Sequence, residues 1–91
     1  MTDIENEVFP VVAMRTIFDG AQAIFRFDNG YGASVISHGY SYGTELAVIK
    51  FNSEDNDDWD IVYDTPVTDN VIGNIADQYD LANLLVQIRS L

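Results

Sequence analysis

The sequence predicts an α+β fold: a four- or five-stranded, mostly antiparallel sheet arranged as a meander, with a C-terminal helix packed on one face. Three observations predict it. Two turn signals, Asp19-Gly20 and Asn29-Gly30, separate segments in which apolar and polar residues alternate with the period of a strand. Further short apolar segments bounded by polar loops follow them. Near the C-terminus the apolar period changes to that of a helix.

The first predicted strand covers residues 8–18, which are largely apolar and β-branched. Pro10 has no backbone N–H, so it belongs at the start of a strand or on an edge of the sheet. Residues 1–7 hold three acidic side chains and show no periodicity, so we expect them to form a flexible leader. All 91 residues are therefore expected in a single domain with one modest core.

The dipeptide Asn29-Gly30 predicts a tight hairpin between residues 21–27 and 31–37, because both central residues of a type I′ turn need positive φ. Ile24 falls on the outer face of the first of these strands, and alternation places four residues on its core face: Ala21, Ala23, Phe25 and Phe27. Gly32 has no side chain, which suits a bulge or the close approach of another element.

Residues 45–51 and 59–63 are the fourth and fifth predicted strands. The fourth carries apolar residues on both faces, which favours a central position in the sheet. The fifth ends at Asp64-Thr65-Pro66, because a residue before proline is driven towards extended or turn geometry.

The last third of the chain changes period. A short turn capped by Thr68 or Asp69 is expected to run to residue 72 and to stop at Gly73. Asp77 can then cap a final helix, whose apolar stripe recurs at helical spacing: Leu81, Leu84, Leu85 and Ile88. A helix of about a dozen residues is marginal alone, so we expect it to lie across one face of the sheet.

The charge balance is the main compositional constraint on function. Four Lys and Arg stand against fifteen Asp and Glu, which gives a net charge of −11. Direct binding to nucleic acid or to an anionic membrane is therefore disfavoured. The charge can still serve binding to basic partners, binding to cations, or solubility alone.

The chain has no cysteine, which excludes disulfides and thiolate metal sites. It has no apolar run near the roughly 20 residues of a membrane span, and its acidic start is unlike a signal peptide.

The densest acidic run supplies the main candidate site: Glu54, Asp55, Asp57, Asp58 and Asp60. If extended, these seven residues would span about 23 Å, over which one strand of B-form DNA carries about seven phosphates. This density suggests phosphate mimicry. A solvated loop between strands is the plain alternative, and a calcium site is a third. The EF-hand pattern fails, because the run has no glycine and no glutamate at its twelfth position. We expect no metal and no cofactor.

Tyr40 and Tyr42 are a second candidate, because tyrosines contribute contact area at low entropic cost in binding sites. They can equally fold back over their own sheet. His38 is the only histidine, and its neighbour Ser37 would point to the opposite face of a strand, which does not suit a nucleophile and base.

Arg15 and Arg26 fall on paired strands and are expected to neutralise nearby carboxylates. The sequence contains no phosphate-binding loop, dinucleotide fingerprint or nucleophile elbow, so we expect a protein that is not an enzyme.

Three segments, together with the leucine-rich C-terminal helix, resemble the small acidic proteins encoded by bacteriophages: residues 27–35, 42–48 and 63–67. The resemblance covers residues 16–91 and concerns turns and strands, so it implies a fold and a context more than an activity. The implied context is the cytoplasm of a bacterial host and a genome that often carries small inhibitors of host enzymes and defence systems.

Together these features favour a non-enzymatic inhibitor that occupies a basic groove on a bacterial nucleic-acid-handling or defence protein, as an anti-CRISPR protein or DNA mimic would. The alternative is a self-associating structural or accessory phage protein, for instance a homodimer formed by an exposed edge strand, in which acidity serves solubility.

Overall fold

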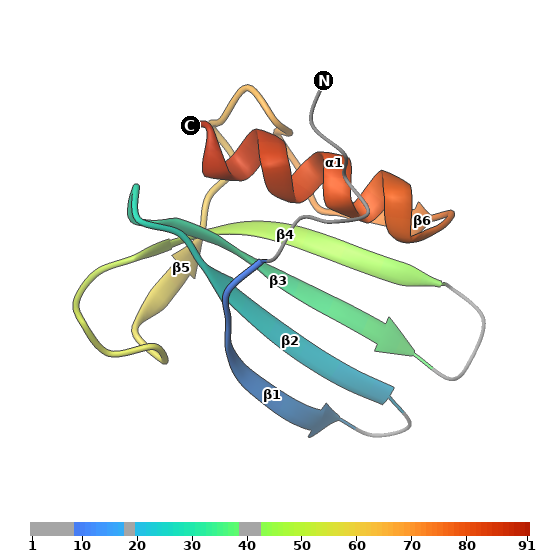
Figure 1. The fold of residues 1–91 in the computed structure, drawn as a ribbon, viewed down its shortest axis with the longest axis horizontal. Helices are drawn as coiled ribbons and strands as arrows, with labels where there is room; N and C mark the ends of the chain where they lie inside the picture. Colours follow the sequence, from blue (N-terminus) through green and yellow to red (C-terminus); the bar gives the residue numbers. More distant parts are fainter. Residues whose placement is uncertain (1–8, 18–19, 39–42) are drawn as a thin grey trace.

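The computed structural model describes residues 9–17, 20–38 and 43–91. The predicted leader, Asp19 of the first turn signal, and both Tyr40 and Tyr42 lie outside these residues. The elements follow one another along the chain as a meander and then a helix (Figure 1): β1 Val11–Ile17, β2 Gly20–Arg26, β3 Tyr31–His38, β4 Thr44–Phe51, β5 Trp59–Ile61, β6 Ile72–Ile75 and α1 Gln78–Arg89.

The strands form one antiparallel sheet in the order β1-β2-β3-β4-β5, and β6 also pairs with β4. This confirms the α+β class, the meander and the central position of the fourth strand. The strand β6 was not predicted, since we expected a turn there. Gly73 and Asn74 suit a strand poorly, and Asn74 has a positive φ of 54°. Pairing of Leu46 with Ile72 and of Thr44 with Ile75 outweighs these local preferences.

The β2–β3 hairpin is confirmed, but its turn is not the expected type I′. Only Gly30 has positive φ (85°), and Asn29 does not. The turn places Asp28 and Asn29 between Phe27 and Gly30, whose N–H donates to the Phe27 carbonyl at 3.2 Å. A turn followed by a glycine in the left-handed region is the other common hairpin solution.

Asn29 does not adopt the left-handed conformation. Its side chain makes hydrogen bonds both to the hairpin and to the helix α1. Its Oδ1 accepts from the Tyr31 N–H at 3.0 Å, and its Nδ2 donates to the Ile88 carbonyl at 2.9 Å and the Arg89 carbonyl at 3.1 Å. The last carbonyls of a helix have no partner within it. This asparagine therefore ties the hairpin to the C-terminal end of α1.

The helix lies across one face of the sheet, as expected (Figure 1). Asp77 caps it by accepting from the backbone N–H groups of Tyr79 and Asp80 at 2.9 and 3.0 Å. Its buried side chains join strand residues in the first core: Phe25, Phe27, Ala33, Val35, Leu46, Val48, Leu85 and Ile88. This core supplies most of the apolar burial.

The opposite face of the sheet carries a smaller second core: Ile24, Ile49 and Phe51, with Val12, Ala13 and Trp59 packed against it. Ile24 thus lies on the face opposite Phe25 and Phe27, as the alternation predicted, but it is fully buried because this face has a core of its own. The sheet coils, so that side chains from β1 and from β5, its two edges, reach the same cluster.

Gly32 permits this packing. A Cβ at this position would lie 2.0 Å from the Phe25 carbonyl oxygen and 2.8 Å from a ring carbon of Phe51. The expectation of a close approach at Gly32 is thus confirmed, and the approaching groups are the neighbouring strand and the Phe51 ring.

Candidate acidic interface

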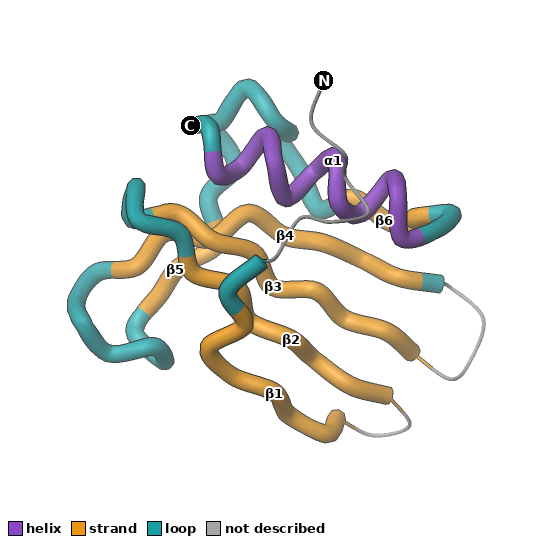
Figure 2. The backbone as a smooth tube through the Cα atoms, viewed as in Figure 1, coloured by secondary structure: helices purple, strands orange, loops and turns teal. Residues whose placement is uncertain are grey.

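The acidic run lies mainly in the loop of residues 52–58, here called the acidic loop, which joins β4 to β5. It projects beyond the strands at that end of the sheet (Figure 2). The Asn52 N–H donates to the Asp58 carbonyl at 2.9 Å, so the two ends of the loop meet. Inside it, Asp58 N–H donates to the Asp55 carbonyl at 3.1 Å. The backbone of this segment is therefore a closed loop, and the extended spacing considered for it does not apply.

Short side chains within the loop support this turn. Ser53 Oγ accepts from the Asp55 N–H at 3.1 Å, and Asp55 Oδ1 accepts from the Asp57 N–H at 2.9 Å. Side-chain acceptors two residues before a backbone N–H are typical of turns rich in Ser and Asp. The residues that carry the charge thus also shape the loop.

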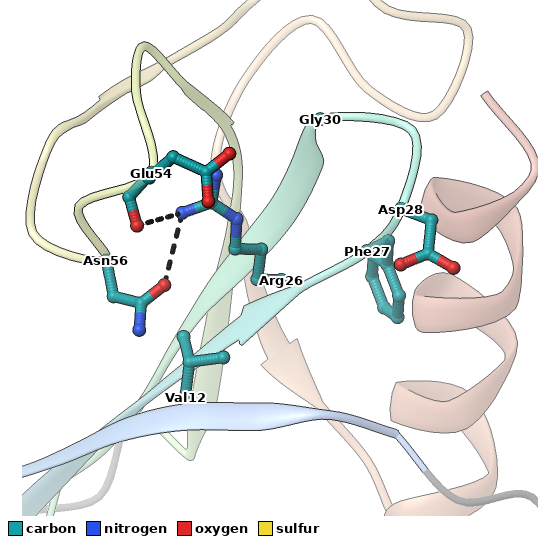
Figure 3. Close-up of a pocket in the computed structure, with 7 residues that line it drawn as sticks. All are labelled: Val12, Arg26, Phe27, Asp28, Gly30, Glu54 and Asn56. Carbon is teal, nitrogen blue, oxygen red and sulfur yellow. Dashed lines mark hydrogen bonds between the residues drawn. The ribbon is translucent and has the colours of Figure 1, made fainter.

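Arg26, on β2, holds the acidic loop against the sheet (Figure 3). Its guanidinium donates to the Ser53 carbonyl at 2.6 Å, the Glu54 carbonyl at 3.2 Å and Asn56 Oδ1 at 3.1 Å. It also lies over the Phe51 ring, with Cζ 4.3 Å from the ring centroid. Arg26 was expected to neutralise a carboxylate. Its guanidinium instead donates hydrogen bonds to two backbone carbonyls and to the side-chain amide of Asn56. Arg26 thus holds the loop through its backbone and the Asn56 amide.

Arg15, on β1, makes the second tether through an ion pair with Asp57. The expected neutralisation of a carboxylate by Arg15 is confirmed. Both side chains are largely exposed, at 43% and 68%, so the pair contributes little energy and is screened by salt. Its structural effect is to connect the edge strand β1 with the acidic loop across the second core.

The five predicted acidic residues are all exposed. Asn52 Nδ2 donates to Asp58 Oδ1 at 3.3 Å and to Asp60 Oδ2 at 3.0 Å, which draws these two carboxylates together. Like charges held close raise the local negative potential. The predicted residues thus all lie exposed on the hydrogen-bonded loop or at the start of β5, and two of them share the Asn52 donor.

Apolar side chains that sequence reasoning did not single out border these acidic residues. Trp59 packs on the second core, with a buried indole nitrogen that has no hydrogen-bond partner among the described residues. Ile61 and Tyr63 follow it and are 39% and 53% exposed. The alternation Trp59, Ile61, Tyr63 was a usable signal, since it would place three large side chains on one face of the predicted strand 59–63, although β5 itself ends at Ile61.

A shallow hollow lies between the acidic loop and the strands, with Arg26 reaching across it (Figure 3). Asp28 also lines it, but its carboxylate points away from the guanidinium in this view.

In residues 9–17, 20–38 and 43–91, no three His, Asp or Glu side chains gather closely enough to hold a metal ion. None of the helices in that part of the chain is long and apolar enough to cross a membrane. The side chain of His38 lies outside what is described.

Comparison of the chain with protein-family models, with curated proteins and with solved structures found no match.

Proposed function

We propose that this chain is a non-enzymatic inhibitor that places its acidic loop in a basic groove of a bacterial nucleic-acid-handling or defence protein, in the manner of an anti-CRISPR protein or DNA mimic. One observation carries the proposal. The carboxylates of the acidic loop face solvent, while the loop backbone is bound by Arg26 through the Ser53 and Glu54 carbonyls.

This arrangement suits binding because the loop is ordered before a partner arrives. A disordered acidic loop would lose conformational entropy on binding, whereas a loop that already has its bound shape avoids most of that cost. Clustered negative charge on a chain of net charge −11 also steers a basic surface into contact and raises the association rate.

The target class follows from the same charge. A groove that binds nucleic acid is lined with Lys and Arg placed to contact phosphates. A compact group of carboxylates can take the place of a few neighbouring phosphates. The bacterial host and its cytoplasm enter the proposal from the resemblance to phage-encoded acidic proteins.

The test is capture of proteins from bacterial lysate on the immobilised chain at low and at high salt. The loop variant replaces Glu54 and Asp58 with Lys and leaves the Arg15–Asp57 pair intact. The control variant replaces Asp64 and Asp69 with Lys. Both residues are also exposed, and the net charge changes by the same amount. We expect a nucleic-acid-binding protein to be captured by the native chain and by the control at low salt, and lost with the loop variant.

Equal capture by the native chain and the loop variant would contradict the proposal. Equal loss with both variants would assign the binding to total charge and would also count against a specific groove.

The second candidate is self-association through an edge strand, and the exposure of β1 favours it. Val11 and Met14 are 46% and 67% exposed on this outermost strand. Sedimentation at several concentrations separates the two functions, because a chain that stays monomeric at high concentration contradicts self-association.

A further inference from the structure

The outer edge of β5 presents backbone groups that no strand within the described residues satisfies. The Val62 N–H donates to the Val48 carbonyl, and the Asp58 carbonyl accepts from the Asn52 N–H, each at 2.9 Å. In an antiparallel pair, residues alternate between bonding inward and pointing outward. Asp58, Asp60 and Val62 therefore bond towards β4, and the N–H and C=O groups of Trp59 and Ile61 point away from it.

The side chains along this edge alternate in chemistry as well. Ile61 lies opposite Ile49 and Trp59 opposite Phe51, both of the second core, so Trp59 and Ile61 share the face opposite α1, and Tyr63 follows two residues beyond the end of β5. Ile61 and Tyr63 remain partly exposed there, at 39% and 53%. On the other face, Asp58 and Asp60 are exposed. One edge thus offers apolar contacts on one face and negative charge on the other.

We propose that this edge binds an extended segment of the partner by strand addition, and that the segment alternates apolar residues with Lys or Arg. Its backbone would bond with Trp59 and Ile61, as in other cases where a peptide extends a sheet. Its apolar side chains would pack beside Ile61 and Tyr63, and its cations would lie beside Asp58 and Asp60 as opposite-charge cross-strand pairs. The basic character of the partner rests on the proposed function.

The charge on this edge disfavours a second copy of the chain as its occupant. Pairing two β5 edges would bring the exposed carboxylates of Asp58 and Asp60 against the same residues of another copy, and like charges across strands destabilise a sheet. The acidic residues thus disfavour pairing of this edge with a second copy and favour pairing with a basic strand.

The other edge of the sheet, β1, is a poorer acceptor. Its register shifts between Val11 and Ala13, and Pro10 precedes it. Irregularity of this kind twists an edge away from regular pairing. The cation of Arg15 also lies on this strand, where it would oppose a basic segment. Strand addition of a basic segment is therefore specific to β5.

The probe is a synthetic peptide with four Lys-Val repeats and blocked ends. Two control peptides are a block of four Lys followed by four Val, and the alternating peptide with N-methyl groups on its bonding amides. Binding is followed by the fluorescence of Trp59, the only tryptophan of the chain, and by amide hydrogen exchange. We expect the alternating peptide alone to bind and to slow exchange at Trp59 and Ile61.

Two variants locate the site. Ile61→Lys puts a cation on the β5 edge, and Met14→Lys puts the same charge on the exposed surface of β1. We expect Ile61→Lys to weaken binding about tenfold or more, because it replaces an apolar cross-strand contact with the valines of the peptide by a charged side chain that cannot make it. Met14→Lys should leave binding within about twofold, as a distant exposed charge is screened.

Equal binding of the alternating and block peptides, or of the N-methylated one, would overturn strand addition without depending on any variant. Equal weakening by both Lys variants would overturn it too, and would point to bulk charge. These results leave the proposed function standing. If instead the peptide binds at β5 but the charge-reversed loop still captures the same lysate proteins, the proposed function fails and the strand-addition site remains.

Discussion

The two faces of the sheet are closed in different ways. On one face, α1 buries apolar side chains such as Leu85 and Ile88, which are 2% and 0% exposed. On the other, a small apolar cluster is bordered by the acidic loop, which Arg26 and Arg15 hold by hydrogen bonds and an ion pair. The first closure depends on apolar burial and the second mainly on polar contacts near solvent.

The two faces therefore differ in how much charge they can carry. Burial of a helix needs an apolar stripe and tolerates little change. A loop held largely through its backbone carbonyls keeps its acidic side chains exposed, so carboxylates can accumulate there without disturbing the first core. Substitutions in the two regions should therefore differ in their cost to stability, with the larger losses in the packed cores.

Leu85→Ala should have the largest effect, since it opens a cavity under α1 in the first core. We expect a loss of about 2–5 kcal/mol in the free energy of unfolding, measured with urea. The control is Asn83→Ala on the exposed side of the same helix, with an expected change within about 0.5 kcal/mol. Similar losses for both would mean that α1 does not pack as described.

Gly32→Ala should follow, because the new methyl group would meet the Phe25 carbonyl and the Phe51 ring. We expect a loss of about 1–3 kcal/mol from overpacking. Gly73→Ala is the matched control, since a Cβ there meets nothing within 4 Å. A tolerated alanine at Gly32 would show that the second core is loosely packed.

Arg26→Met keeps a long side chain over Phe51 but removes the donors to the acidic loop. We expect a loss of about 0.5–1.5 kcal/mol from the missing hydrogen bonds, since the exposed carbonyls can then bind water, and faster hydrogen exchange at the Asn52 and Asp58 amides. Lys50→Met is the control, because this cation lies 5.5 Å from the Tyr31 ring on the other face and does not touch the loop. Unchanged exchange in Arg26→Met would contradict the tether.

Asp57→Asn should have the smallest effect, because it removes only the exposed pair with Arg15. We expect a loss of at most about 1 kcal/mol at low salt that disappears at high salt. Asp69→Asn removes the same charge without that pair, so the difference between the two variants isolates the pair. A difference that persists in high salt would indicate a contact stronger than a surface ion pair.

Much of the fold could be read from local patterns. Asp77 was identified as a helix cap by its position before an apolar stripe, and the structure shows it capping. Apolar residues on both faces of β4 indicated its central place. The hairpin at Asn29 was found from its dipeptide, although the turn type was wrong, since the same two residues suit more than one hairpin geometry.

The rest depended on contacts between distant residues. The strand β6 is short and contains poor strand formers, so only its pairing with β4 makes it a strand. Asn29 binds carbonyls of α1 nearly sixty residues away, and Arg26 binds a loop almost thirty residues away. No local pattern carries such pairings.

The class of fold, the large negative charge and the segment where acidic residues concentrate all follow from composition and local periodicity. The tertiary structure, in contrast, made this segment a closed loop and not an extended row. It did so because the coiling of the sheet brings β1 and β2 beside the loop, where their arginines bind it. The outward backbone groups of β5 were likewise decided by strand order, which hydrogen bonds between distant segments establish.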